Sequence, residues 1–125
     1  MKEQTALLLD KAQRAIHAAE TLRAAGDTDF AIGRAHYAMF YAAEALLNER
    51  GLHFRKHGGV HAAFGGHLVK KGQFDAKYHR WLLDAFDKRI LGDYAVGAAL
   101  SSEDAESTID HARQFLAEAQ RHLNA

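Results

Sequence analysis

The chain of 125 residues contains no cysteine, which excludes disulfides, thiolate metal sites and a cysteine nucleophile. Proline is also absent, although an average content of about 5% would supply roughly six. The simplest explanation is a chain of long helices separated by glycine. No apolar run approaches the roughly 20 residues of a membrane span, and the N-terminal sequence MKEQTALLLDKAQRA is too charged for a signal peptide. These absences predict a soluble, cytoplasmic protein that makes no contact with a membrane.

The overall charge is balanced, because 16 basic residues stand against 16 acidic ones. No global field therefore attracts the protein to nucleic acid. Residues 51–74 differ from the rest, because they contain no Asp or Glu and carry the cations Arg55, Lys56, Lys70 and Lys71. We expect this basic segment to contact the phosphate of RNA or of a nucleotide. The alternative is a solvated loop that serves solubility.

The apolar periodicity predicts helices at about 3–25, 28–50, 60–71 and 74–96, and a fifth that begins at Ser101. Gly26, Gly51 and Gly72 are placed to end the first three. No strand pattern or internal repeat is present. We predict a single domain spanning 1–125 that folds as an all-α, four-to-five-helix up-and-down bundle, with the first two helices as an antiparallel hairpin.

The predicted second helix presents two distinctive faces. Small side chains recur at helical spacing on one of them, at Ala31, Ala35, Ala38, Ala42 and Ala45. Another helix can approach this face closely. Arg34, Tyr37 and Tyr41 share a neighbouring face, so a guanidinium and two phenols need partners there.

The sequence KRILGDYA in the predicted fourth helix places Arg89 and Asp93 four residues apart on one face, with Tyr94 about 100° further round. One interpretation is a structural ion pair, extended to Arg34 as a network that fixes helix register. The other is an anion site. In it Arg89 and Arg34 bind a phosphodiester, Asp93 orients one arginine, and Tyr94 donates or accepts a proton.

Metal and cofactor chemistry find little support. His57 and His61 have the spacing of a metal pair, but no carboxylate stands beside them as in HExxH, and we expect them to be solvent-facing or capping residues. The chain contains no Glu-x-x-His sequence, which a di-iron centre of the ferritin type would require. The glycines lack the Lys-Ser/Thr ending of a P-loop. We therefore expect no metal and no cofactor.

Three segments occur in the order GRAHYAMFYAAEALLNERG, HFRKHGGVHAAFGGHLVKKG and KRILGDYA. Together they resemble the HEPN family (higher eukaryotes and prokaryotes nucleotide-binding), in particular its small stand-alone bacterial and archaeal branch. The resemblance implies a helical bundle that forms a homodimer and is often encoded beside a minimal nucleotidyltransferase, as a toxin and antitoxin. It also implies a metal-independent ribonuclease, whose motif is an arginine followed after four to six residues by a histidine and meets its dimer mate in a cleft.

Arg89 matches the motif arginine, but Tyr94 stands where the histidine is expected, and no histidine follows until His111. A phenol with a pKa near 10 is a poorer base at neutral pH than an imidazole with a pKa near 6.5. We therefore expect a degenerate or atypical ribonuclease site, supported by Arg34 and Tyr37. The resemblance also implies a tyrosine that the partner modifies with AMP, and Tyr94 lies at a different offset. The alternative is a non-enzymatic scaffold in which the Arg/Asp cluster is structural.

Overall fold

The computed structural model describes residues 1–124, and of His57 the backbone alone. Its elements are α1 (Glu3–Ala24), α2 (Thr28–Glu49), α3 (His57–Phe64), the π-helix η1 (Gly65–Val69), α4 (Ala76–Tyr94) and α5 (Ser102–Asn124). The described residues contain no strand, which confirms the predicted all-α class. The bounds of α1, α2, α4 and α5 agree with those predicted to within two residues.

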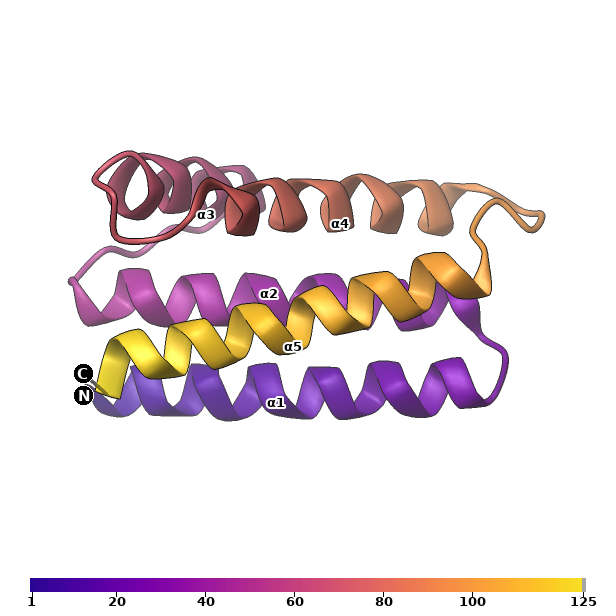
Figure 1. Ribbon diagram of the computed structural model, residues 1–125, viewed down its shortest axis with the longest axis horizontal. Coiled ribbons are helices and arrows are strands. Elements are labelled where there is room, and N and C mark those ends of the chain that lie inside the picture. Colours follow the sequence, from indigo (N-terminus) through magenta and orange to yellow (C-terminus); the bar gives the residue numbers. More distant parts are fainter. Residues whose placement is uncertain (125) are drawn as a thin grey trace.

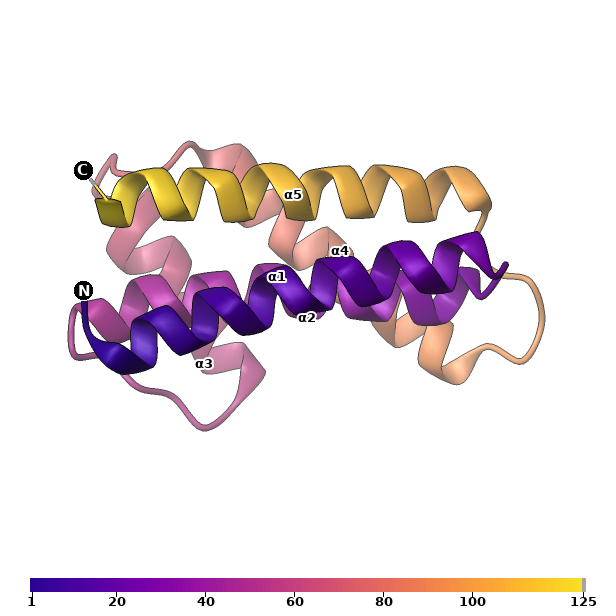
Figure 2. The ribbon, with the colours of Figure 1, turned by 90° about the horizontal axis from the view of Figure 1, so that it is seen from below.

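Helix α2 is the centre of the bundle (Figure 1). It forms an antiparallel hairpin with α1 and also packs against α4 and α5, while α5 runs beside α1 (Figure 2). The four long helices alternate in direction, as predicted, and α3 with η1 forms a short helical segment that connects α2 to α4 in the chain. Helices α1 and α4 lie on opposite sides of α2 and do not pack against each other.

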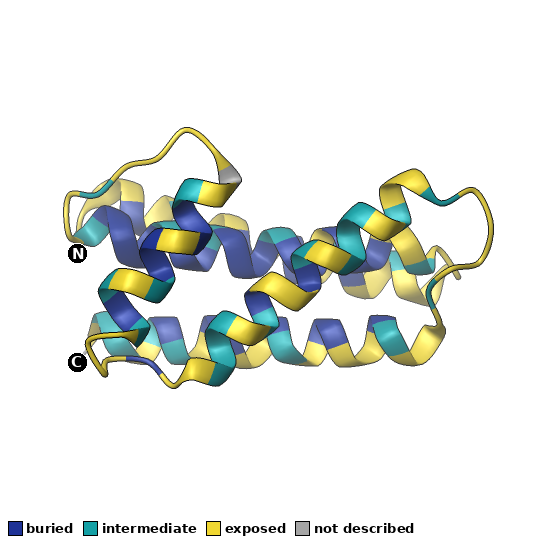
Figure 3. Cartoon of the chain, turned by 90° about the horizontal axis from the view of Figure 1, so that it is seen from above, coloured by how far each residue is buried: buried dark blue, intermediate teal, exposed yellow. Residues whose placement is uncertain are grey.

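The alanine face of α2 is fully buried, as its spacing predicts. Its five members have an exposed fraction of 0%: Ala31, Ala35, Ala38, Ala42 and Ala45. Figure 3 shows that buried positions dominate α2 and are sparse along α4, where only Leu82 and Ala85 are buried. The part of α4 that carries the candidate site is therefore close to solvent.

The glycines predicted to end helices do so with positive φ angles. Gly26, Gly51 and Gly72 have φ of 86°, 77° and 76°, a left-handed conformation that only glycine adopts without strain. None of the described helices is long and apolar enough to cross a membrane.

The third predicted helix differs from the observed one. It begins at His57 instead of Val60, and from Gly65 it continues as a π-helix to Val69. A Cβ atom at Gly65 would lie 2.7 Å from Cε1 of His79, so the imidazole occupies the space beside the bare α-carbon. Nε2 of His79 donates to the carbonyl oxygen of His61 at 3.1 Å. This ring on α4 lies over the segment where the helical period changes.

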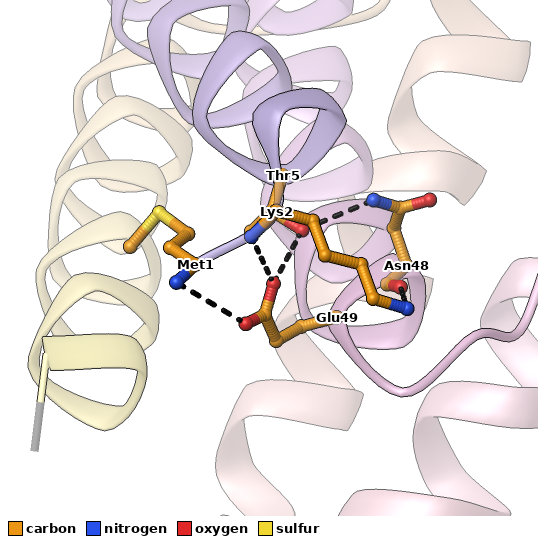
Figure 4. A network of polar contacts seen from close by, with 5 residues as sticks. All are labelled: Met1, Lys2, Thr5, Asn48 and Glu49. Carbon is orange, nitrogen blue, oxygen red and sulfur yellow. Dashed lines mark hydrogen bonds and ion pairs between the residues drawn. The ribbon is translucent and has the colours of Figure 1, made fainter.

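A polar network joins the start of α1 to the end of α2 (Figure 4). Glu49 Oε1 accepts from the backbone N–H of Lys2 at 2.8 Å and from the Thr5 hydroxyl at 2.9 Å, and Oε2 lies 3.8 Å from the amino group of Met1. These hydrogen bonds, led by the one from Lys2, lower the pKa of Glu49. Thr5 in turn accepts from Asn48 Nδ2 at 3.0 Å. The sequence patterns gave no sign of this network.

Candidate anion-binding site

A groove of about 350 Å³ lies where the first turns of α2 face the last turns of α4, with Leu22 of α1 at its edge. Its other lining residues are Asp29, Phe30, Gly33, Arg34, Tyr37, Arg89 and Asp93. The fold thus brings together four residues of the predicted site that are up to 59 positions apart in the chain, from Arg34 to Asp93. Helical spacing on two different helices accounts for this.

Arg89 is held by α4 and α2 together. Its Nε donates to Asp93 Oδ2 at 3.2 Å, one helical turn away. Its guanidinium carbon lies 4.9 Å from the ring centroid of Tyr37, and its Cγ lies 3.7 Å from where a Cβ of Gly33 would be. Only 18% of the side chain is exposed. The guanidinium therefore has a fixed position and little water around it.

One nitrogen of Arg89 has no acceptor. Nη1 is buried and finds no hydrogen-bond partner among the described residues. A buried donor without a partner costs about 1–3 kcal/mol, and more when it is charged. Arg89 therefore lacks one hydrogen-bond acceptor, and it is one of the residues that line the groove.

Arg34 supplies a second cation to the groove. Its guanidinium carbon lies 4.6 Å from the ring centroid of Tyr37, the ring that Arg89 also contacts. Arg34 is exposed and forms no ion pair with any described residue. Two carboxylates also line the groove, since Asp93 binds Arg89 and Asp29 accepts from the backbone N–H of Phe30 at 3.0 Å. Arg34 and Nη1 of Arg89 are the groups left for an external anion.

Tyr94 lies outside this groove. It is the last residue of α4, its exposed fraction is 82%, and it does not line the cavity. Five residues correspond to a rotation of about 140° around the helix, so its phenol leaves α4 on a different face from Arg89. The structure therefore does not bring Tyr94 together with Arg89 and Asp93 in this groove.

The predicted basic segment lies at the other end of the bundle (Figure 1). Arg55 and Lys56 precede α3, whereas Lys70 and Lys71 follow η1. The 13 residues of α3 and η1 separate the two pairs by about 20 Å at 1.5 Å per residue. The four cations therefore form two pairs instead of one patch, and neither pair borders the groove.

Among the residues that the structure describes, no group of three His, Cys, Asp or Glu side chains is placed to hold a metal ion. The side chain of His57 lies outside the described residues. His61 is buried, and its Nε2 lies 3.4 Å from Nε2 of His36, a pair that the sequence reasoning missed. Phe30 also lines the groove and was not among the predicted site residues, although Phe30, Arg34 and Tyr37 share one helical face.

Comparison with known proteins gives a consistent result. The model of the HEPN domain matches residues 5–122. A "UPF0332 protein" of Gloeobacter violaceus is 36% identical over 110 residues, which cover 87% of each chain. Two proteins of Methanocaldococcus jannaschii that bear the name "putative toxin" are 29% and 32% identical, over 98% and 93% of this chain and 83% and 86% of their own lengths.

Proposed function

The chain belongs to the HEPN domain family, and from this premise we propose that it is the RNA- or nucleotide-binding component of a toxin–antitoxin-like module. The groove between α2 and α4 is its anion site. The names of the two Methanocaldococcus jannaschii relatives support a toxin-like role. A minimal nucleotidyltransferase is the partner that the family resemblance suggests.

The observation that carries this proposal is the unpartnered Nη1 of Arg89. Phosphate oxygens are strong acceptors, and a guanidinium binds them through two donors in a fixed fork. Asp93 fixes Nε, which leaves the Nη groups for the phosphate. Arg34 contacts the same Tyr37 ring as Arg89 and adds a second cation. A phosphodiester in the groove satisfies the missing acceptor.

The groove is better equipped to bind RNA than to cleave it. No histidine is among its lining residues, so it holds no group whose ordinary pKa lies near neutrality. We propose a degenerate or atypical ribonuclease site. If it cleaves RNA at all, we expect the cleavage to persist in a metal chelator and to disappear in Arg89→Ala.

A second copy of the chain is the expected neighbour of the groove. Four large apolar side chains are exposed at this end of the bundle, namely Phe30 (62%), Leu91 (47%), Tyr94 (82%) and Val96 (103%). Exposed apolar surface of this kind commonly marks an interface. We expect a dimer in analytical ultracentrifugation that Phe30→Glu converts to a monomer. The matched change Leu7→Glu, at a position 56% exposed on α1, should leave the dimer intact.

Tyr94 is accessible to a modifying partner because of its exposure. The proposal therefore includes transfer of AMP to this phenol by the nucleotidyltransferase. Incubation with ATP and a minimal nucleotidyltransferase should add the mass of one AMP group to the wild type and release pyrophosphate. Tyr94→Phe should remain unmodified, and modification of that variant would rule out Tyr94.

The alternative function is a scaffold in which Arg89 is structural. The packing of its stem beside Gly33 and of its guanidinium on Tyr37 favours this reading, because it ties α4 to α2. In that case Arg89→Ala should lower the melting temperature and leave RNA affinity unchanged.

The test compares RNA binding by the wild type and Arg89→Ala, measured by fluorescence anisotropy with a single-stranded RNA. We expect Arg89→Ala to bind the RNA at least tenfold more weakly than the wild type, because hydrogen bonds to charged groups contribute about 1.5–3 kcal/mol. Arg14→Ala is the matched control, since Arg14 forms the same kind of pair with Asp10 at 3.1 Å but is 70% exposed. Equal affinities for all three proteins would contradict the anion site.

A further inference from the structure

A second pocket lies at the far end of α2 from the groove. Its volume is about 300 Å³, and it is lined by segments of α1, α2, the α2–α3 connection and α3. Leu8, Leu47, Leu52 and Val60 form its apolar part, and the polar groups come from Gln4, Glu44, Asn48 and His53. An apolar cavity with a few oriented polar groups is the usual form of a small-ligand site.

Asn48 offers this pocket an acceptor whose orientation is fixed. Thr5 donates its hydroxyl proton to Glu49, so its oxygen accepts from Nδ2 of Asn48. The amide oxygen of Asn48 then lies on the opposite side and points away from the network (Figure 4). Among the described residues no group donates to this oxygen, and Asn48 lines the pocket with only 4% of its surface exposed.

Glu44 adds a second acceptor one helical turn earlier on the same face of α2. Burial raises the pKa of its carboxyl group, and the nearby charge of Lys11 opposes this increase in part. Lys11 itself lies over the ring of Tyr41, with Nζ 4.7 Å from the centroid, and Glu44 forms no ion pair with any described residue. A half-desolvated carboxylate gains from a ligand that donates hydrogen bonds.

Phe54 forms an aromatic wall of the pocket. Its ring packs against the bare α-carbon of Gly59, where a Cβ would lie 3.1 Å from Cδ1, and 39% of the residue remains exposed. The next two residues are the exposed cations Arg55 and Lys56. A flat ring can stack on Phe54 while a phosphate on the same ligand reaches the two cations.

We infer that this pocket binds a nucleobase with an exocyclic amino group, adenine or cytosine, whose amino group donates to Glu44 and Asn48 and whose phosphate meets Arg55 and Lys56. Uracil and hypoxanthine place an oxygen where these bases carry the amino group, and that oxygen would face the carboxylate. The site rests on the proposed binding of RNA or nucleotide, but it lies apart from Arg89. It gives the protein a way to select bases as well as phosphates.

The test is a titration of the ¹⁵N-labelled protein with AMP and IMP, followed by NMR. In IMP a carbonyl oxygen replaces the amino group, and N1 carries a proton. We expect AMP to shift the side-chain amide of Asn48 and the backbone amides of residues 52–54, with an affinity at least tenfold above that of IMP. In the same way, CMP should bind at least tenfold more tightly than UMP. Glu44→Ala should remove the preference, and Glu3→Ala, which changes an exposed carboxylate outside the pocket, should preserve it.

Equal affinities for AMP and IMP, or no shift at Asn48 at millimolar concentrations, would overturn the inference. Tighter binding of an eight-residue oligoadenylate than of AMP assigns the pocket to a base of an RNA strand, and equal binding assigns it to a free nucleotide. Arg89→Ala should leave the shifts that AMP causes at Asn48 and residues 52–54 unchanged, because Arg89 does not line this pocket. Unchanged RNA affinity in that variant would refute the groove while leaving this pocket intact, so the two proposals fail separately.

Discussion

His111 shows how a single stacked ring makes stability depend on pH. Its imidazole lies parallel to the indole of Trp81, with centroids 4.0 Å apart and planes at 3°. Burial lowers the pKa of His111, and the charge of Asp110 opposes this effect. Because the folded state has the lower pKa, this residue contributes full stability above the unfolded pKa of about 6.5, and the contribution is lost as pH falls through the folded value.

Replacing His111 with phenylalanine should therefore flatten the pH dependence of unfolding. The variant keeps a ring that stacks on Trp81 but cannot bind a proton. Between pH 7.5 and pH 5.5 the melting temperature of the wild type should fall by more than the melting temperature of His111→Phe. The same decrease in both proteins would show that His111 does not titrate in this range.

At the same scale, residue spacing predicted the groove better than residue chemistry did. Arg34, Tyr37, Arg89 and Asp93 meet because each follows the 3.6-residue period of a long helix. The chemistry of Tyr94 predicted that it carries a proton in this site. Because Tyr94 is one residue beyond Asp93, it lies on another face of the helix and is exposed to solvent. The sequence did not predict a site at Glu44 and Asn48, because the pocket that they line is completed by a loop and by residues of α1.

At the scale of the element, η1 depends on a glycine that the sequence alone marks only as a weak helix former. The ring of His79 lies 2.7 Å from the position of a Cβ at Gly65, whereas the Cβ position at Gly66 has nothing within 4 Å. A side chain at position 65 would therefore collide with His79, whereas one at position 66 would have room. Helix propensity treats them as equal.

Alanine substitutions should separate these two glycines. Gly65→Ala should lower the free energy of unfolding by about 1–3 kcal/mol, because the methyl group displaces His79. Gly66→Ala should leave it unchanged or raise it by up to about 1 kcal/mol. Chemical denaturation measures both, and equal effects would contradict the assigned role of His79.

The start of α5 is held by a cap at Ser101, the residue at which the sequence predicts that this helix begins. Ser101 Oγ accepts from the backbone N–H of Asp104 at 3.0 Å, and Asp104 Oδ2 accepts from the backbone N–H of Ser101 at 2.9 Å. This reciprocal pair is a capping box, and its hydrogen bonds lower the pKa of Asp104.

Loss of this cap should cost about 1 kcal/mol of unfolding free energy in Ser101→Ala. The contribution of Asp104 should be present above its unfolded pKa near 3.9 and be lost as pH falls through the lower folded value. Ser102→Ala is the control, because no described residue bonds to the Ser102 side chain. A similar loss in the control would show that helix propensity, and not the cap, is responsible.

At the scale of the whole molecule, α2 connects the two proposed sites. The Arg89 groove lies over its first turns and the Glu44 pocket over its last. The order and packing of the long helices could be predicted because apolar periodicity encodes them. The second pocket could not, because nine residues between Gln4 and Val60 line it and no periodic pattern links them.

The central claim is that Arg89 contacts a phosphate, and its most direct test is the salt dependence of RNA binding. Each phosphate contact to a single strand contributes about 0.7 to the slope of log K against log salt concentration. We predict that Arg89→Ala reduces the magnitude of this slope by about 0.7 per protomer relative to the wild type, and that Arg14→Ala leaves it unchanged. Parallel lines for the wild type and Arg89→Ala would contradict the account.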